Sequence, residues 1–321
     1  MNSFTIVIPI KDTDKEFEYM TKSISSAIKL NPSELIIGLD KPSPQRIKER
    51  ALEISKKFSF TNIRFLEVEK SNDWNFQLAN ILWYCYEQAS NDRIFSFDVD
   101  STVNRTILIG CDMLGKDNIA LVSFTKKTRI DNLTDLFRFI MYRIRISFAS
   151  YVFSGNYWIY RPYFFDIIKK ENYKKIVNGV DTFLTEAILD SKYKMVTRKE
   201  MGVNCMDLQN EEYDWRQFQD GIWFFAHKDE LTKTITQEHL KRKIKPKFGF
   251  LHKNPTFYIF AKSLAYWRWW IWKGYLWAKK NPNSECVQMA KNMNQKSWNF
   301  QGSKYLPNLE WKNRGTGFVR E

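Results

Sequence analysis

Short apolar runs alternate with helical segments over residues 1–100 of the chain. The run at 4–10 is rich in β-branched side chains and is typical of a strand buried on both faces of a sheet; a second buried strand is predicted at 35–40, and further strands at 62–69 and 93–100. Between them, apolar residues recur at helical spacing over 14–30, 44–58 and 75–89. Strands that alternate with helices predict an α/β fold with an open, largely parallel sheet.

The alternation becomes looser beyond residue 104. Strands are predicted over 118–124, within 156–165 and over 193–197, and helices over 135–153 and 181–192. A chain of 321 residues suits one large domain with an appendage, or two small domains.

Charge is distributed unevenly along the chain. Residues 1–240 hold 33 Lys and Arg against 33 Asp and Glu, whereas 241–321 hold 17 basic and three acidic residues, so the whole net charge of +14 lies in the last quarter. Seven of the twelve tryptophans lie there too, five of them between Trp267 and Trp277. We therefore expect a first domain over 1–240 and a basic, aromatic C-terminal region over 241–321 that has an anionic partner.

Within that region, residues 255–280 have the spacing of a two-sided helix. One face holds apolar side chains and the other holds cations: Phe260, Leu264, Trp267 and Ile271 against Lys262, Lys273 and Lys280. Tryptophan combined with cations favours a helix that lies in the headgroup layer of an anionic membrane. The alternative is a helix packed on the rest of the protein, with its tryptophans in a core. Single-stranded nucleic acid is a third partner of such patterns, but no RNA-recognition motif accompanies this one.

The remaining compositional signals concern location. No uninterrupted apolar run reaches the length of a membrane span. The opening MNSFTIVIPIKD predicts a strand rather than a signal peptide, because it lacks a basic start and a small-residue cleavage site. The four cysteines are scattered without CxxC pairing, which predicts free thiols in a reducing compartment. A cytoplasmic location follows, with peripheral attachment to the cytoplasmic face of the membrane through the C-terminal region.

Two carboxylates follow the fourth predicted strand, in the motif FSFDVDS. Asp98 and Asp100 are separated by one residue, so in an extended segment both side chains project to the same side. Such a pair can hold a hard divalent cation, which in turn can neutralise a diphosphate leaving group. The alternative is a solvated acidic turn. Asp40 also ends a predicted strand, and the carboxyl ends of parallel strands are where open sheets bind ligands.

Asp181 precedes an amphipathic helix in NGVDTFLTEAI. It has two interpretations: the N-cap of that helix, or a general base that removes a proton from an acceptor hydroxyl. His227, His239 and His252 are too far apart to form a local metal motif, and a structural histidine is the favoured interpretation of His227.

Taken in order, these motifs resemble the family 2 glycosyltransferases. The resemblance rests on the succession VIPIKD, LIIGLDKPS, a helix with Asn80, FSFDVDS, SGNYWIYRPYFF and GVDTFLTEAILDSKYKM, and covers residues 4–200, with a fainter echo in YDWRQFQDG. It implies the GT-A fold, a mixed sheet flanked by helices. It also implies inverting transfer of a sugar from a nucleotide-diphosphate donor, assisted by Mg²⁺ or Mn²⁺.

The resemblance assigns the donor side by position. Pro9 and Ile10 would line the nucleotide base, and Asp40 would contact the base or the ribose. Asn80 would belong to the same donor site. The family's usual acidic, glycine-containing turn is replaced here by LDKPS, and Ala79 stands where an arginine is common, which leaves the identity of the donor open.

The reacting side is assigned in the same way. Asp98 would approach the ribose and diphosphate, and Asp100 would ligate the metal together with it. Gly155 and Asn156 would line the sugar and acceptor site, and Asp181 would be the catalytic base. The acceptor would be a glycan hydroxyl or a lipid-linked phosphate.

Two other classes of function fit part of the pattern. A nucleotidyltransferase also uses a metal on paired carboxylates, although it usually has a glycine-rich basic loop, which is absent near residues 9–16. A basic protein that binds membrane or nucleic acid without catalysis would explain the C-terminal region alone.

Overall fold

The structure is a computed structural model that describes residues 3–69, 77–127, 156–169, 191–206 and 271–292, with residues 136, 140, 184, 187–188, 218 and 221–229. The chain divides into two compact units. The first comprises Met1–Arg129 and Ile144–Asp207, and the second comprises Ile130–Arg143 and Leu208–Glu321. The boundary at residue 240 that charge and composition indicated stays a prediction.

The first unit begins with the predicted alternation of strands and helices. Its elements are β1 (Thr5–Ile10), α1 (Asp14–Ile28), β2 (Glu34–Asp40), α2 (Gln45–Lys57), β3 (Ile63–Val68), α3 (Gln77–Gln88) and β4 (Arg93–Ser96). Strands β3, β2, β1 and β4 are neighbours in this order and all parallel. The α/β fold expected for this part of the chain is therefore confirmed.

The second half of this unit makes the sheet mixed. It contributes β5 (Ser101–Val103), η1 (Arg105–Ile107), α4 (Leu108–Met113), η2 (Lys116–Asn118), β6 (Ile119–Lys127), β7 (Tyr157–Tyr160), α6 (Arg161–Ile167) and β8 (Lys194–Cys205). The eight strands lie in the order β3-β2-β1-β4-β7-β6-β8-β5. Strand β7 is antiparallel to both β4 and β6, and β5 is antiparallel to β8. The expectation of a largely parallel sheet is thus wrong beyond β4, while the mixed sheet flanked by helices is confirmed.

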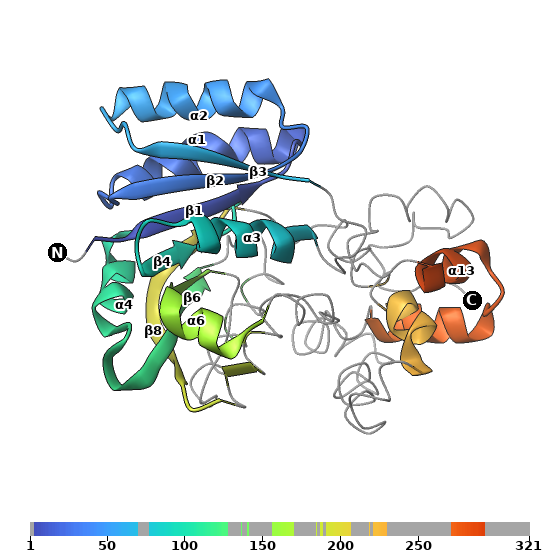
Figure 1. Cartoon of the computed structure of the whole chain (residues 1–321). Coiled ribbons are helices and arrows are strands. Elements are labelled where there is room, and N and C mark those ends of the chain that lie inside the picture. Colours follow the sequence, from blue (N-terminus) through green and yellow to red (C-terminus); the bar gives the residue numbers. More distant parts are fainter. Residues whose placement is uncertain are drawn as a thin grey trace. The chain divides into compact units, whose positions relative to one another are not determined.

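Hydrophobic packing explains why the strands are apolar on both faces. Ile6, Ile8 and Ile10 of β1 enter one core, which contains residues of α1 and α2. Val7 of the same strand points to the opposite face, into a second core that contains residues of α3 and α6. Figure 1 shows α1 and α2 on one side of the parallel strands and α3 on the other. The apolar run at 4–10 is therefore a strand covered on both faces.

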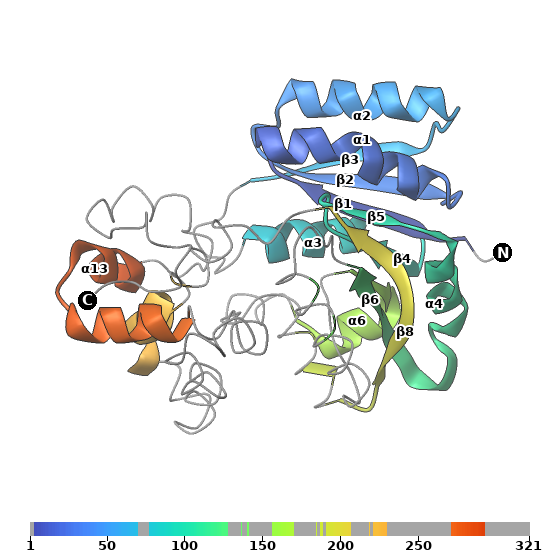
Figure 2. The ribbon, with the colours of Figure 1, turned by 180° about the vertical axis from the view of Figure 1, so that it is seen from behind.

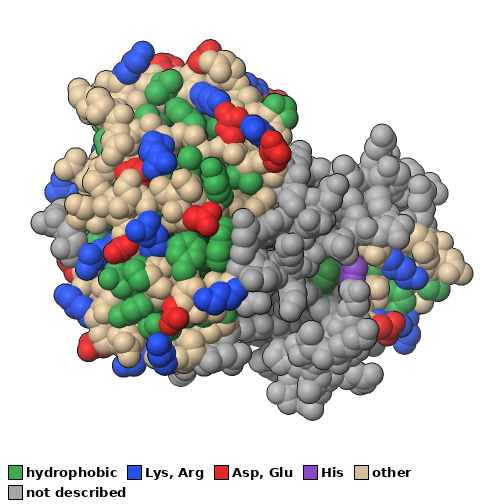
Figure 3. Space-filling view, in the orientation of Figure 1, with side chains coloured by type: hydrophobic (Ala, Val, Ile, Leu, Met, Phe, Trp, Pro, Cys, Tyr) green, Lys and Arg blue, Asp and Glu red, His purple; other side chains and the backbone are tan. Residues whose placement is uncertain are grey.

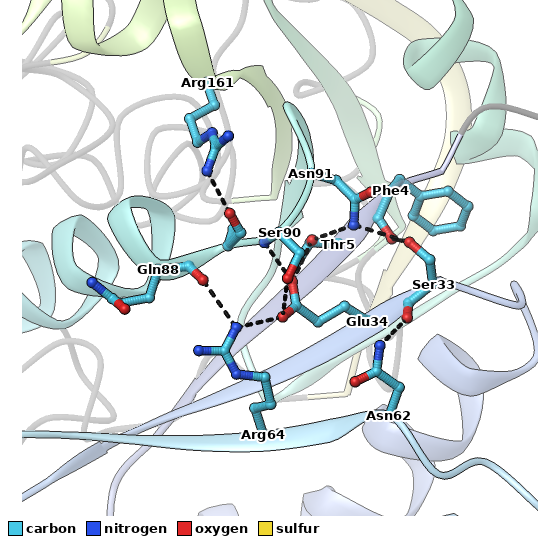
Figure 4. A network of polar contacts seen from close by, with 11 residues as sticks. Phe4, Thr5, Ser33, Glu34, Asn62, Arg64, Gln88, Ser90, Asn91 and Arg161 are labelled. Atoms are coloured by element: carbon cyan, nitrogen blue, oxygen red, sulfur yellow. Dashed lines mark hydrogen bonds and ion pairs between the residues drawn. The ribbon is translucent and has the colours of Figure 1, made fainter.

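A buried acidic network lies where β2 begins. The Glu34 side chain is 1% exposed and accepts hydrogen bonds from Thr5 Oγ1 at 2.7 Å, Ser90 N and Oγ at 2.9 Å, and Arg64 Nη1 at 2.6 Å (Figure 4). Asn91 joins the network by donating to Thr5 Oγ1 and Ser33 Oγ, at 2.9 Å each. The network ties β1, β2 and β3 to the segment between α3 and β4, at the end of the sheet opposite the carboxyl ends of these strands.

The described part of the second unit is helical. Residues 221–226 and 271–280 form helices, followed by α13 (Glu285–Asn292). Two glycines allow close approach: a Cβ built on Gly221 would lie 2.0 Å from Ile271 O, and one on Gly274 would lie 1.9 Å from Phe218 O. Backbones that pass this closely exclude any side chain at either position.

Packing also accounts for part of the aromatic C-terminal region. Ile271 and Ala278 are buried, and Trp272 and Trp277 are partly buried. The Trp277 ring lies 6.2 Å from that of Phe218, and Trp272 stacks on Tyr275 at 5.9 Å. The predicted helix is thus confirmed over 271–280, and its residues 255–270 lie outside the described part. In the part of the chain that is described, no helix is long and apolar enough to cross a membrane.

Candidate active site

The strand order places a topological switch point at the carboxyl ends of β1 and β4. The chain builds β1, β2 and β3 in one direction across the sheet and then returns to place β4 on the other side of β1. Open α/β sheets bind ligands at such a switch point, because the loops that leave the two strands diverge there. Pro9 and Ile10 end β1 at this edge; Pro9 is partly exposed, while the Ile10 side chain is buried in the core.

Asp98 and Asp100 occupy the turn that follows β4. The strand ends at Ser96, four residues earlier than predicted, because Ser101 N bonds to Asp98 O at 3.0 Å and so reverses the chain into β5. The expected alternation nevertheless persists through the turn. Both carboxylates are partly exposed, whereas Val99 between them is 4% exposed. Two carboxylates therefore reach the surface at the switch point.

The turn is held by contacts on both sides. Asp98 N donates to Asn156 Oδ1 at 3.1 Å, and Asp100 O accepts from Met206 N at 2.7 Å. The Asp100 carboxylate accepts from Ser101 Oγ at 2.9 Å. These contacts come from the start of β7 and the end of β8, so the antiparallel half of the sheet fixes the acidic turn.

Asn156 is the predicted site residue that the structure brings closest to this turn. Its side chain is fully buried, and its Nδ2 has no hydrogen-bond partner among the residues described. A buried amide donor without a partner costs free energy unless a ligand or water satisfies it. Gly155, beside it, and Asp181 lie outside the described residues, so the roles assigned to these two stay predictions.

The sequence patterns missed a third carboxylate at this site, that of Glu16 in the first turn of α1. Its Oε2 accepts from Lys11 N at 2.6 Å, and its own N donates to Thr13 Oγ1, the N-cap of α1, at 3.2 Å. The signal was present as Thr13-x-x-Glu16 before an apolar helix, the pattern of a capping box. Glu16 thereby fixes the loop that leaves β1 at the switch point.

Electrostatics link Glu16 to the acidic turn. Its pKa is raised to about 6, first by burial, with the charges of Asp98 and Asp100 adding to the rise and the N–H and ammonium group of Lys11 opposing it. A like charge within a few ångströms disfavours the ionised form. A cation bound at the acidic turn would therefore relieve repulsion among these carboxylates.

The residues fit a hard divalent cation that shares its ligands with a substrate. Among the described residues, no group of three His, Cys, Asp or Glu side chains could hold a metal by itself. Mg²⁺ keeps part of its water shell and commonly takes one or two carboxylates plus substrate phosphates, which matches the pair Asp98 and Asp100. His227 is not suited to such a role, since its Nε2 lies 2.9 Å from Ala290 O and its ring stacks on Trp223.

The two other predicted donor-site residues lie on elements that border the same edge. Asp40 is the last residue of β2 and is partly exposed. Directly after it, a hollow of about 520 Å³ is lined by Lys41, Pro42, Ser43, Lys48, Glu67 and Glu69. Asn80 lies in the first turn of α3, which packs on β1, β2 and β3, and its side chain is 8% exposed.

Comparisons with known proteins give structural similarities only. No protein-family model matches the chain, and no curated protein matches it. Among solved structures, it is similar to the mannosyltransferase PcManGT from Pyrobaculum calidifontis in complex with GDP-Man and Mn²⁺, with 13% identity, coverage of 96% of this chain and 88% of that one, and a TM-score of 0.48.

Two further similarities are to structures in complex with UDP. S. aureus TarS 1-349 in complex with UDP is 12% identical over 88% of this chain and 93% of that one, with a TM-score of 0.45. Glucosyl-3-phosphoglycerate synthase from Mycobacterium tuberculosis, in complex with Mn²⁺, UDP and phosphoglyceric acid, is 15% identical over 64% of this chain and 71% of that one, with a TM-score of 0.41.

Proposed function

We propose that the chain is a metal-assisted glycosyltransferase of the GT-A type that uses a nucleotide-diphosphate sugar and inverts the anomeric centre. The single observation that carries the proposal is the pair of surface carboxylates, Asp98 and Asp100, at the switch point of the sheet, where the family resemblance requires a metal-binding pair. The partly exposed Asp40 and the buried amide of Asn156 lie on elements that meet the same edge.

In the proposed reaction, an acceptor oxygen forms a bond to the anomeric carbon while the bond from that carbon to the diphosphate oxygen breaks. The electron pair of the broken bond goes to the diphosphate. For a hydroxyl acceptor, its proton goes to the carboxylate of Asp181. A divalent cation, Mg²⁺ or Mn²⁺, would neutralise the leaving group when bound to Asp98 and Asp100. Pro9, Ile10, Asp40 and Asn80 would hold the nucleotide, and Gly155 and Asn156 the sugar.

Removal of the metal tests the proposal directly. We expect at least one donor from a panel that includes UDP-glucose and GDP-mannose to bind in the presence of Mn²⁺, and to lose about tenfold or more in affinity when EDTA is added, because the diphosphate would then face an acidic site. Calorimetry measures the binding, and release of the nucleoside diphosphate measures turnover.

The two alternatives give other outcomes. Release of pyrophosphate from a nucleoside triphosphate would identify a nucleotidyltransferase. Absence of binding by any donor with Mn²⁺ would leave the acidic turn as a solvated surface feature and would contradict the proposal.

We further propose that the C-terminal region attaches the enzyme to the cytoplasmic face of an anionic membrane. The basis is the charge excess of residues 241–321 together with their tryptophans. Each cation near an anionic bilayer contributes about 1 kcal/mol, so the full chain carrying Lys241→Gln, Arg242→Gln and Lys243→Gln should bind anionic vesicles roughly 10²-fold more weakly than the unchanged protein. Co-sedimentation with vesicles at low salt measures this.

The matched control removes the same charge from the first unit, through Lys56→Gln, Lys116→Gln and Lys194→Gln, all at exposed positions. It should bind vesicles as the unchanged protein does. If both triple variants bind equally, or if no form binds at low salt, the tryptophans of this region serve packing and the membrane proposal fails.

A further inference from the structure

A second hollow, of about 730 Å³, lies between the second half of α1 and the segment that leaves the acidic turn. Figure 2 shows α1 and β5 on the side of the sheet that faces the viewer, and the two elements are in contact. The described lining consists of Thr21, Lys22, Ser25, Ser26, Lys29, Leu30, Thr102, Val103, Asn104 and Arg105. Its two walls are joined by a hydrogen bond from Val103 N to Ser26 Oγ at 3.1 Å.

The lining of the hollow is basic, and no described acidic side chain in it offsets the positive charge. Its cations are Lys22, Lys29 and Arg105. None of the three cations takes part in an ion pair among the residues that the structure describes. This differs from the first 240 residues as a whole, in which acidic and basic residues are equal in number, and from the face in Figure 3, where the two kinds of charge intermingle over the described surface.

Packing within the fold explains only one of these cations. Lys29 is the C-cap of α1, where a positive charge is favoured, and its Nζ lies 5.8 Å from the centre of the Phe58 ring. Lys22 lies in the middle of α1 and Arg105 begins η1, and both are exposed residues that no described ion pair engages.

Hydroxyl groups complete the lining. The Thr21 hydroxyl accepts from Arg50 Nη2 at 3.0 Å, and Arg50 itself is paired with Glu53 at 2.6 Å. Ser26 Oγ is engaged by Val103 N and donates to Ser23 O at 2.8 Å. Ser25 and Thr102 are partly exposed, and neither hydroxyl has a side-chain hydrogen bond within the described part of the chain. The hollow therefore offers three cations and two hydroxyl donors to one ligand.

We infer that this hollow binds a phosphate group, carried either by a small soluble compound or by a lipid headgroup. A phosphate has more acceptor oxygens than a carboxylate and a charge near −2, so it can accept from several cations and hydroxyls at once. The volume is in the range of pockets that hold small molecules. The site is separate from the acidic turn at Asp98 and Asp100, because β5 runs back from this turn along α1 toward the opposite end of the sheet.

The test uses full-length protein and inorganic pyrophosphate as the probe. Metal is left out, because without it the carboxylates of the acidic turn repel pyrophosphate. The double variant Lys22→Gln, Arg105→Gln should bind pyrophosphate about tenfold or more weakly than the unchanged protein in calorimetry, because it loses two charged donors. The control, Lys56→Gln with Lys116→Gln, has the same net charge and alters exposed lysines elsewhere. Its affinity should stay within about twofold of the unchanged protein, as it keeps every donor of the hollow.

Vesicles distinguish the two sources of phosphate. If the hollow variant also binds phosphatidylglycerol vesicles more weakly than the control does, the ligand is a lipid headgroup. If both variants bind vesicles equally while only the hollow variant loses pyrophosphate, the ligand is a soluble phosphate compound. The inference is overturned if the unchanged protein does not bind pyrophosphate saturably, or if the two double variants lose affinity equally. Unchanged melting temperatures show that both variants are folded.

Discussion

Transfer from a nucleotide-diphosphate sugar should fall by about 10²- to 10³-fold when Asp100 is replaced by alanine, the usual cost of removing one electrostatic stabiliser of a developing charge. The residual activity should no longer respond to EDTA. Stability should change by only about 1 kcal/mol, because the carboxylate is partly exposed and its described bonds include one from Ser101 Oγ. Initial rates with and without Mn²⁺, together with thermal melting, measure both effects.

Asp112→Ala is the matched control for this experiment. Asp112 is an exposed aspartate on α4, so its loss changes the net charge equally without touching the acidic turn. It should keep full, EDTA-sensitive activity. Transfer by the Asp100 variant at the wild-type rate, with no sensitivity to EDTA in either protein, would eliminate the metal-binding role.

Replacing Glu34 with alanine should destabilise the first unit by about 3 kcal/mol or more, which corresponds to a fall in melting temperature of roughly 6–12 °C. The side chain is 1% exposed, and its removal takes the acceptor from Ser90 N, Ser90 Oγ and Thr5 Oγ1 and leaves Arg64 with only Gln88 O as a described acceptor. Glu49→Ala is the control, because that exposed glutamate accepts from the i−4 residue Gln45 on the same helix. Equal melting temperatures of the two variants would show that the buried network contributes little.

The contribution of Glu34 should also depend on pH. Burial raises the pKa of this carboxyl, but hydrogen bonds from Ser90, Arg64 and Thr5 outweigh burial and lower the pKa below its usual value of 4.5. A lowered folded-state pKa means that the stabilisation is complete above the unfolded-state pKa and is lost as pH falls through the folded-state pKa. The gap in unfolding free energy between the wild type and Glu34→Ala should therefore be constant near neutral pH and narrow below about pH 4.5. Urea titrations at several pH values measure it.

Much of the fold could be predicted because local patterns and tertiary packing agree in the first hundred residues. The run at 4–10 became β1 with Ile6 and Ile8 on one face and Val7 on the other, since both faces are covered. The β4 prediction failed at its end, because the turn at Asp98 depends on a hydrogen bond within the turn and on pairing of β5 with the distant β8. Periodicity contains no information about such long-range pairing.

The candidate site was predictable in part for the same reason. Asp40, Asp98 and Asp100 follow apolar runs, so their positions at strand ends could be read from order alone. Glu16 was missed because an acidic residue in the first turn of a helix normally indicates helix capping. Only the tertiary structure brings it under the electrostatic influence of Asp98 and Asp100. Asp181 remains a prediction.

Sequence alone determined the alternation of strands and helices in the first hundred residues and the carboxylates that follow its strands, because apolar runs and helical spacing are properties of neighbouring residues. The tertiary structure decided the rest. It set the strand order that makes a switch point between β1 and β4, the antiparallel β7 that hydrogen-bonds Asn156 to Asp98, and the contact of α1 with β5 that forms a basic hollow. These features join residues far apart in the chain, and their free energy comes from contacts that no local pattern encodes.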